Sequence, residues 1–182
     1  VDEADSQHSL ANLLFRSDHL DDALSLLLKS LEIKKAHLNE ENMDIALSYH
    51  AMGNVFCAKK EMDKAMTYYN KALSIREKIY PADHVEISDI HDNIGSVYDE
   101  LNAFEKALSH YEIALKIKSK IYNESNEDIG ISYMCMGLTK LKMNDRLGAK
   151  QSIVKAHQIF SKCLGNDDFK TIQMATLLHH LP

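Results

Sequence analysis

Residues that interrupt regular structure are scarce in this sequence, which has only two prolines and six glycines in 182 residues. Together with 45% hydrophobic and 26% charged residues, this composition is typical of a soluble helical protein, and it predicts an all-α fold without strands. No apolar run approaches the roughly 18 residues that a membrane-spanning helix needs. The first residues also lack the basic start and apolar core of a secretory signal. Because the chain begins at Val1 rather than at a methionine, we expect it to be part of a longer protein.

Cysteine and basic charge are also limited. The three cysteines, Cys57, Cys135 and Cys163, form no CxxC pair and are odd in number, which favours a reducing, cytoplasmic compartment. The formal net charge is −6, whereas a general nucleic-acid binder needs a basic face to neutralise phosphates. We therefore expect neither nucleic acid nor a membrane among the partners.

Catalytic motifs are missing as well. The sequence contains no nucleophile elbow, no HExxH, no glycine-rich phosphate loop and no histidines spaced i, i+4. His179 and His180 are the closest histidine pair, but adjacent helical residues point about 100° apart and do not readily share one ion. The sequence thus predicts no enzyme activity, no cofactor and no metal site.

What the sequence does contain is an internal repeat, whose 42-residue period separates Gly53 from Gly95 and Gly95 from Gly137. The stretch from Asp83 to Tyr122 matches the sequence one period before it and one period after it. The matching sets are Tyr49, Met52, Gly53, Phe56, Ala65, Tyr69 and Ala72; His91, Ile94, Gly95, Tyr98, Ala107, Tyr111 and Ala114; and Tyr133, Met136, Gly137, Ala149, Ile153 and Ala156. Small and aromatic residues at this spacing predict close-packed antiparallel helix pairs, each packed only on its neighbours.

The period divides the chain into one array over residues 1–182. Its expected parts are a degenerate repeat 1 (1–38), repeat 2 (43–80), repeat 3 (85–122), repeat 4 (127–164), and a capping helix or truncated fifth repeat (168–182). Hydrophobic spacing predicts helices at about 4–17, 20–38, 43–59, 62–80, 85–100, 104–122, 127–142, 146–164 and 168–181. A glycine inside a helix costs about 1 kcal/mol relative to alanine, and closer packing must offset that cost. The glycines are therefore expected where the two helices of a pair cross. Ile172, Ala175 and Leu178 are expected to cover repeat 4.

The segments Ala72–Tyr80 and Ala114–Tyr122 share the pattern Ala-Leu-x-Ile-x-x-Lys-Ile-Tyr. This ending and the 42-residue spacing resemble tetratricopeptide repeats of the longer variety found in kinesin light chains. The linkers Asn42–Ala46, His84–Ser88 and Asn126–Gly130 lack the proline of the His-Pro-Asp-Val-Ala sequence that is usual there. The resemblance implies a tetratricopeptide-repeat α-solenoid, a right-handed superhelix whose inner, concave surface is lined by the first helix of each pair.

The exposed stripe of those first helices is the predicted peptide-binding groove. Its members follow the helical spacing i, i+3, i+7, i+10 and change from polar through acidic to apolar along the chain. The predicted groove residues are His8, Asn12, His50, Asn54, Asp89, Asp92, Ser96, Asp99, Met134, Leu138 and Leu141.

These features predict a non-enzymatic adaptor that binds a peptide segment of another protein. The carboxylates beside an apolar end favour a basic–apolar segment and disfavour acidic peptides. Two alternatives remain open at this point: a regulatory sensor whose array closes on a short signalling peptide, and a self-assembly module that associates through the C-terminal helix.

Overall fold

The computed structural model describes residues 2–181, which divide into two compact units, residues up to 82 and residues from 83 onward. The regular structure within these described residues is nine α-helices: α1 (Asp2–Arg16), α2 (Leu20–His37), α3 (Met43–Ala58), α4 (Met62–Ile79), α5 (Val85–Glu100), α6 (Phe104–Ile121), α7 (Glu127–Lys142), α8 (Arg146–Cys163) and α9 (Phe169–His179). The all-α prediction is confirmed, and the predicted helix ends lie within two residues of the observed ones. Between residues 2 and 181 no helix combines the length and apolar character needed to cross a membrane.

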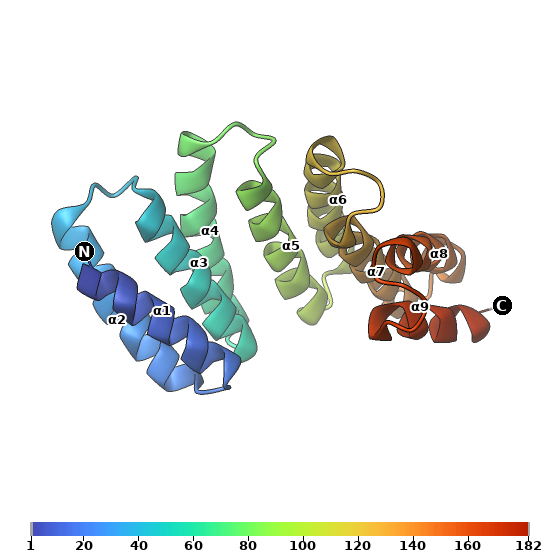
Figure 1. The fold of residues 1–182 in the computed structure, drawn as a ribbon, viewed down its shortest axis with the longest axis horizontal. Coiled ribbons are helices and arrows are strands. Elements are labelled where there is room, and N and C mark those ends of the chain that lie inside the picture. The colour runs from blue at the N-terminus through green and yellow to red at the C-terminus, as the bar shows by residue number, and fades with distance from the viewer. Residues whose placement is uncertain (1, 182) are drawn as a thin grey trace. The chain divides into compact units, whose positions relative to one another are not determined.

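The helices form antiparallel hairpins in both units. In the first unit α1 pairs with α2 and α3 with α4, and α2 packs on α3 (Figure 1). In the second unit α5 pairs with α6 and α7 with α8, while α6 packs on α7 and α9 on α8 (Figure 1). Each helix therefore contacts mainly its sequence neighbours, as expected for a repeat.

The turn inside every hairpin contains one residue in the left-handed backbone region. Asp18, Lys60, Asn102 and Asn144, which are separated by one repeat period each, have φ values of 61°, 61°, 57° and 63°. The N–H of the following residue bonds back to the helix, as Glu61 N does to the Phe56 carbonyl oxygen at 2.9 Å. Glycine adopts this geometry most easily, and Asn and Asp adopt it more readily than other residues, so Asp or Asn at three of these four positions fits the turn.

The predicted close crossing of the paired helices is confirmed at all three repeat glycines, with Ile153 Cγ1 2.7 Å from a Cβ atom at Gly137 and with aromatic rings opposite Gly53 and Gly95. A Cβ atom at Gly53 would lie 2.5 Å from the ring of Tyr69, and one at Gly95 would lie 2.7 Å from the ring of Tyr111. The next contact of Gly95 is the Ala107 carbonyl oxygen at 3.2 Å. Any side chain at Gly53 or Gly95 would displace a buried ring.

The second helix hairpin begins at the predicted cap. Asn42 Oδ1 accepts a hydrogen bond from Asp44 N at 2.7 Å. His84, Asn126 and Asp168, which follow Asn42 at successive repeat periods, cap α5, α7 and α9 in the same way. These caps satisfy a backbone N–H of the first turn without the proline usual in the linker.

The prediction that Ile172 and Ala175 cover repeat 4 is wrong. The side chains that α9 buries are Thr171 and Met174, with Leu178 half-buried, whereas Ile172 and Ala175 face outward. Thr171 and Met174 follow Ile129 and Ser132 of α7 by one repeat period, and those two residues are buried as well. The outward side is the one that a following second helix would cover in a complete pair.

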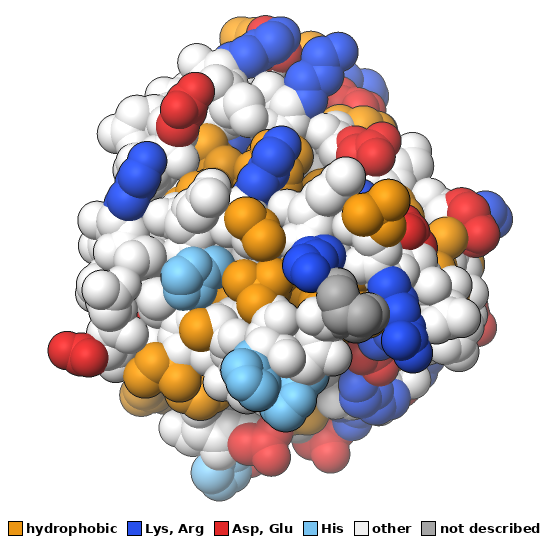
Figure 2. Space-filling view, turned by 90° about the vertical axis from the view of Figure 1, so that its right-hand side faces the viewer, with side chains coloured by type: hydrophobic (Ala, Val, Ile, Leu, Met, Phe, Trp, Pro, Cys, Tyr) orange, Lys and Arg blue, Asp and Glu red, His pale blue; other side chains and the backbone are white. Residues whose placement is uncertain are grey.

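Exposed apolar side chains consequently remain on α9. Phe169 is 76% exposed and Ile172 is 51% exposed. Figure 2 views the molecule from the side where α8 and α9 lie, and it shows apolar side chains near the middle of this face among lysine, arginine and histidine side chains. Leu10 and Leu13 of α1 are exposed as well. Met136 of α7, three repeat periods after Leu10, is instead buried against α6 of the hairpin before it.

Candidate functional site

In the first unit, two of the four predicted groove residues also hold the hairpin together. Asn54 Oδ1 accepts a hydrogen bond from the Tyr69 hydroxyl at 2.8 Å, which fixes the ring that covers Gly53. His50 Nδ1 lies 3.4 Å from Nη2 of the buried Arg76. Burial, with the nearby guanidinium, lowers the pKa of His50 to about 4, so this imidazole is neutral at pH 7.

The other two residues lie on α1. Asn12 is exposed, and His8 is half-buried beside Lys34 and Asp5. Lys34 is buried in α2 and its Nζ lies 3.2 Å from the Asp5 carboxylate. Burial and the Lys34 charge lower the pKa of His8, which therefore presents a neutral ring at pH 7.

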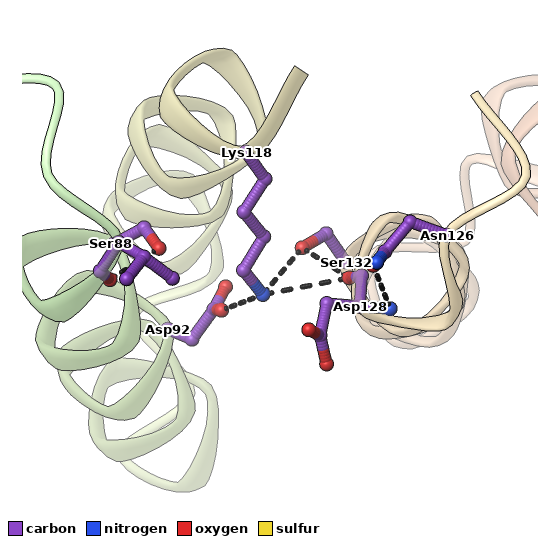
Figure 3. A network of polar contacts seen from close by, with 7 residues as sticks. Ser88, Asp92, Lys118, Asn126, Asp128 and Ser132 are labelled. Atoms are coloured by element: carbon purple, nitrogen blue, oxygen red, sulfur yellow. Dashed lines mark hydrogen bonds and ion pairs between the residues drawn. The ribbon is translucent and has the colours of Figure 1, made fainter. Parts of the chain in front are cut away.

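In the second unit, a buried lysine lies at the centre of the predicted acidic stripe. Lys118 of α6 extends between α5 and α7, and its Nζ lies 2.5 Å from Asp92 Oδ2 (Figure 3). The same ammonium reaches Ser132 Oγ at 3.3 Å and the Asp128 carbonyl oxygen at 3.4 Å. Burial raises the pKa of the Asp92 carboxyl, and the Lys118 ammonium offsets only part of that effect.

Two further carboxylates, those of Asp89 and Asp128, act on the Asp92 carboxylate. Asp89, which is exposed, and Asp128 act on Asp92 strongly enough to add to the rise in its pKa. Asp128 lies in the first turn of α7, and its backbone N–H donates to the side chain of the N-cap residue Asn126 (Figure 3). Asp89, Asp92 and Asp128 therefore form a group of mutually interacting carboxylates on the first-helix face of this unit.

The remaining polar members of the stripe have partners inside the unit. Ser96 lies beside the Tyr111 hydroxyl, one repeat period after Asn54, which accepts a hydrogen bond from the Tyr69 hydroxyl. Asp99 accepts a hydrogen bond from Thr139 Oγ1 at 2.9 Å and forms an ion pair with Lys142. Asp99 therefore contributes to packing between α5 and α7.

The apolar end of the stripe lies on α7. Met134 and Leu141 are half-buried and pack against the core cluster that includes Phe160 and Met174. Leu138, on the same side of α7, is also half-buried. A ligand on this face would thus contact only the outer part of these side chains.

The buried cations were not predicted from the sequence. Lys34, Arg76 and Lys118 recur at the repeat period in the second helices, and all three are almost fully buried. Their periodicity could have predicted this burial. A cation that recurs at a buried position of the repeat indicates a polar partner inside the repeat rather than exposure to solvent. Phe160 occupies the same position in the fourth hairpin.

The chemistry of this surface suits recognition of a ligand by charge and shape. Among the side chains described between residues 2 and 181, no three His, Cys, Asp or Glu residues group as metal ligands. The carboxylates around Lys118 supply hydrogen-bond acceptors for a cationic group, and α7 supplies adjoining apolar area.

Comparison with known proteins agrees with the repeat architecture. Two family models described as tetratricopeptide repeat match residues 4–42 and 44–120. No curated protein matches the sequence.

Solved structures of similar fold include BtubC (BKLC) from P. vanneervenii, with a TM-score of 0.80 and 19% identity over 89% of this chain and 65% of that one. A putative kinesin light chain with TPR-like repeats from Podosopora anserina has a TM-score of 0.81 and 16% identity, over 97% of this chain and 83% of that one. A Rap protein complexed with Competence and Sporulation Factor has a TM-score of 0.78 and 19% identity, over 98% of this chain and 48% of that one.

These identities establish the likeness of fold, and the chain spans less than two thirds of BtubC and about half of the Rap protein. The prediction of a tetratricopeptide-repeat α-solenoid is confirmed by the helix arrangement within the units, the family models and the solved structures. The chain belongs to the tetratricopeptide repeat proteins, and its 42-residue repeats are similar in fold to those of the putative kinesin light chain.

Proposed function

We propose that this chain is a non-enzymatic interaction scaffold that binds a peptide segment of a partner protein on the first-helix faces of its repeats. Proteins built from such repeats are interaction modules, and three cysteines that form no disulfide with one another suit a reducing, cytoplasmic setting. The observation that carries the proposal is the group of three interacting carboxylates, Asp89, Asp92 and Asp128, on the first helices α5 and α7.

The same cluster defines the preferred ligand. A Lys or Arg side chain of the peptide approaches the exposed Asp89 carboxylate, and a neighbouring apolar side chain covers the outer parts of Met134 and Leu138. Exposed charge pairs contribute about 0–1 kcal/mol each, so the charges set preference and salt dependence. Apolar burial at about 25 cal/mol per Å² supplies most of the affinity.

Calorimetric titration tests this proposal. The probes are two short peptides that differ only in charge, one with arginines and one with glutamates on either side of a leucine pair. We expect the arginine peptide to bind more tightly, and we expect Asp89→Lys with Asp128→Lys to reverse the order. Glu112→Lys, the same charge change at an exposed position of α6, is the matched control and should leave the order unchanged. Equal affinity of both peptides for the unmodified chain would refute the proposed preference.

A second function is favoured by one comparison. The Rap protein whose fold resembles this chain was solved in complex with Competence and Sporulation Factor. By this alternative the chain is a regulatory sensor that closes on a short signalling peptide, and we propose the first-helix face as its binding surface as well. Small-angle X-ray scattering separates the two functions, since a sensor becomes more compact when peptide is added and an adaptor keeps its radius of gyration.

Self-association through α9 is the third function, and the exposed Phe169 and Ile172 favour it. Sedimentation velocity at increasing concentration should then show a dimer that Phe169→Ser removes.

A further inference from the structure

Two histidines face each other across the third hairpin. His91 of α5 and His110 of α6 place their Nδ1 atoms 2.9 Å apart, and their ring centroids are 5.1 Å apart. At this distance one ring donates its N–H to the bare nitrogen of the other. Both side chains are half-buried, so the hairpin holds the pair while solvent still reaches it.

The other hairpins do not bring two ring nitrogens together at this place. The residues at the corresponding repeat positions are Gln7 with Leu26, Tyr49 with Tyr68, and Tyr133 with Ser152. In the second hairpin the Tyr49 and Tyr68 rings pack with their centroids 6.0 Å apart. Because a pair of tyrosines fills this place equally well, packing between the two helices does not by itself require histidine.

Neighbouring rings orient the histidine pair. Tyr98, two helical turns after His91 on α5, stacks on the His110 ring with centroids 5.5 Å apart and planes inclined by 30°. The planes of His91 and His110 are themselves inclined by 33°. Since both rings already lie against other rings with their nitrogens facing, a ligand that binds both nitrogens removes little side-chain freedom.

The separation of the two nitrogens is close to what a metal ion needs. Zinc binds histidine nitrogen at about 2.0–2.1 Å, so two histidine ligands of a tetrahedral site have their nitrogens about 3.3 Å apart. The pair therefore has to open by only about 0.4 Å to admit the ion. Imidazole nitrogen suits zinc, copper and nickel, whereas magnesium and calcium prefer oxygen ligands.

Both rings are neutral at pH 7. Burial lowers the pKa of both imidazoles, and the neighbouring His110 adds to the effect on His91, whose pKa falls to about 4. A metal ion binds the lone pair of a neutral ring, so protons compete little at this pH. The ring that carries its hydrogen on Nδ1 has only to move it to Nε2, and no net proton is released.

We propose that His91 and His110 form a binding site for one divalent transition-metal ion of the zinc, copper and nickel class, held between their Nδ1 atoms. Between residues 2 and 181 no third His, Cys, Asp or Glu completes the ligand set, so water fills the remaining coordination positions. The bound ion joins α5 to α6 and stabilises the folded second unit. The site uses neither the carboxylates nor the peptide invoked above, so it holds or fails independently of the proposed function.

Calorimetric titration of the unmodified chain with zinc chloride tests the site, and we expect saturable binding of one ion per chain. Long-range ¹H–¹⁵N spectra of the histidine rings identify the ligand atoms, because the Nδ1 signals of His91 and His110 should shift on saturation. Zinc at about one hundred times its Kd should raise the melting temperature of the second unit by about 5 °C or more. Absence of saturable binding, or shifts confined to other histidines, would overturn the assignment.

Two variants locate the ion. His91→Tyr with His110→Tyr reproduces the ring pair of the second hairpin and should abolish zinc binding, while His110→Gln alone should weaken it at least about tenfold. The matched control is His179→Ala with His180→Ala, which removes the adjacent exposed histidines of α9 and should change neither the affinity nor the melting shift. Unchanged zinc affinity in His110→Gln, or loss of binding in the α9 variant, would refute the site, even if the double-tyrosine variant did not fold.

Discussion

Replacing Lys118 with methionine should destabilise the second unit more than any other single lysine replacement on α6. The variant keeps the buried aliphatic stem but removes the ammonium, which leaves the Asp92 carboxylate without its partner 2.5 Å away. Breaking a buried ion pair in this way costs about 3–5 kcal/mol. Because the Asp92 side chain retains 23% of its exposure, we expect the low end of that range, about 3 kcal/mol.

The matched control is Lys120→Met on the same helix. Lys120 pairs with Asp83 at 2.7 Å, but both side chains are about half exposed, so its loss should cost at most about 1 kcal/mol. Urea unfolding followed by circular dichroism measures both free energies. If the two variants lost stability equally, the internal role assigned to Lys118 would be wrong.

The pH dependence of the Lys118→Met effect provides a second check. Burial raises the pKa of Asp92 in the folded chain, and Lys118 partly offsets this rise, so removal of Lys118 should raise the pKa further. A folded-state pKa above the unfolded value means that the folded chain loses stability as pH rises through it. The loss in Lys118→Met should therefore be largest near pH 7 and smaller in acid, where Asp92 is protonated. Asp92→Leu added to Lys118→Met should restore part of the stability, because no charge is then left buried.

Helix crossing, turn geometry and histidine burial each give a further prediction. Gly95→Leu should cost about 3 kcal/mol or more, since its side chain would meet the Tyr111 ring, and a melting temperature within a degree or two of the unmodified chain would contradict the crossing. Lys60→Gly should raise the free energy of unfolding by about 1 kcal/mol, because the turn places this residue at φ 61°; an unchanged or lower urea midpoint would argue against it. The pKa of His50 is lowered to about 4 from an ordinary 6.5, so the neutral ring contributes stability above pH 6.5 and this contribution is lost as pH falls toward 4. The free energy of unfolding of His50→Gln should therefore depend less on pH in this range. The same pH profile for the variant and the unmodified chain would count against burial of the neutral ring.

The repeat frame and the helix ends were predictable because the same glycines, aromatics and linker polar residues recur at a fixed spacing. Gly53 and Gly95 lie against rings because they have no side chain, and Asn42 caps its helix because its side-chain oxygen accepts a hydrogen bond from a nearby backbone N–H. Such signals need no knowledge of the packing around them.

Features that depend on neighbouring helices were not predictable in the same way. Lys118 looks like a surface residue of α6 until α5 and α7 are placed on either side of it. Ile172 is as apolar as Met174, and only the position of α8 decides which of them is buried.

Hydrogen–deuterium exchange with and without the arginine–leucine peptide tests the central claim most directly, because it locates the binding surface on the unmodified chain. The proposed scaffold predicts slower amide exchange in α5 and α7 when the peptide is bound, with α6 and the outer side of α8 unchanged. Protection confined to α6 or α8, or saturating binding with no change in α5 and α7, would contradict the assignment of the first-helix face as the binding surface.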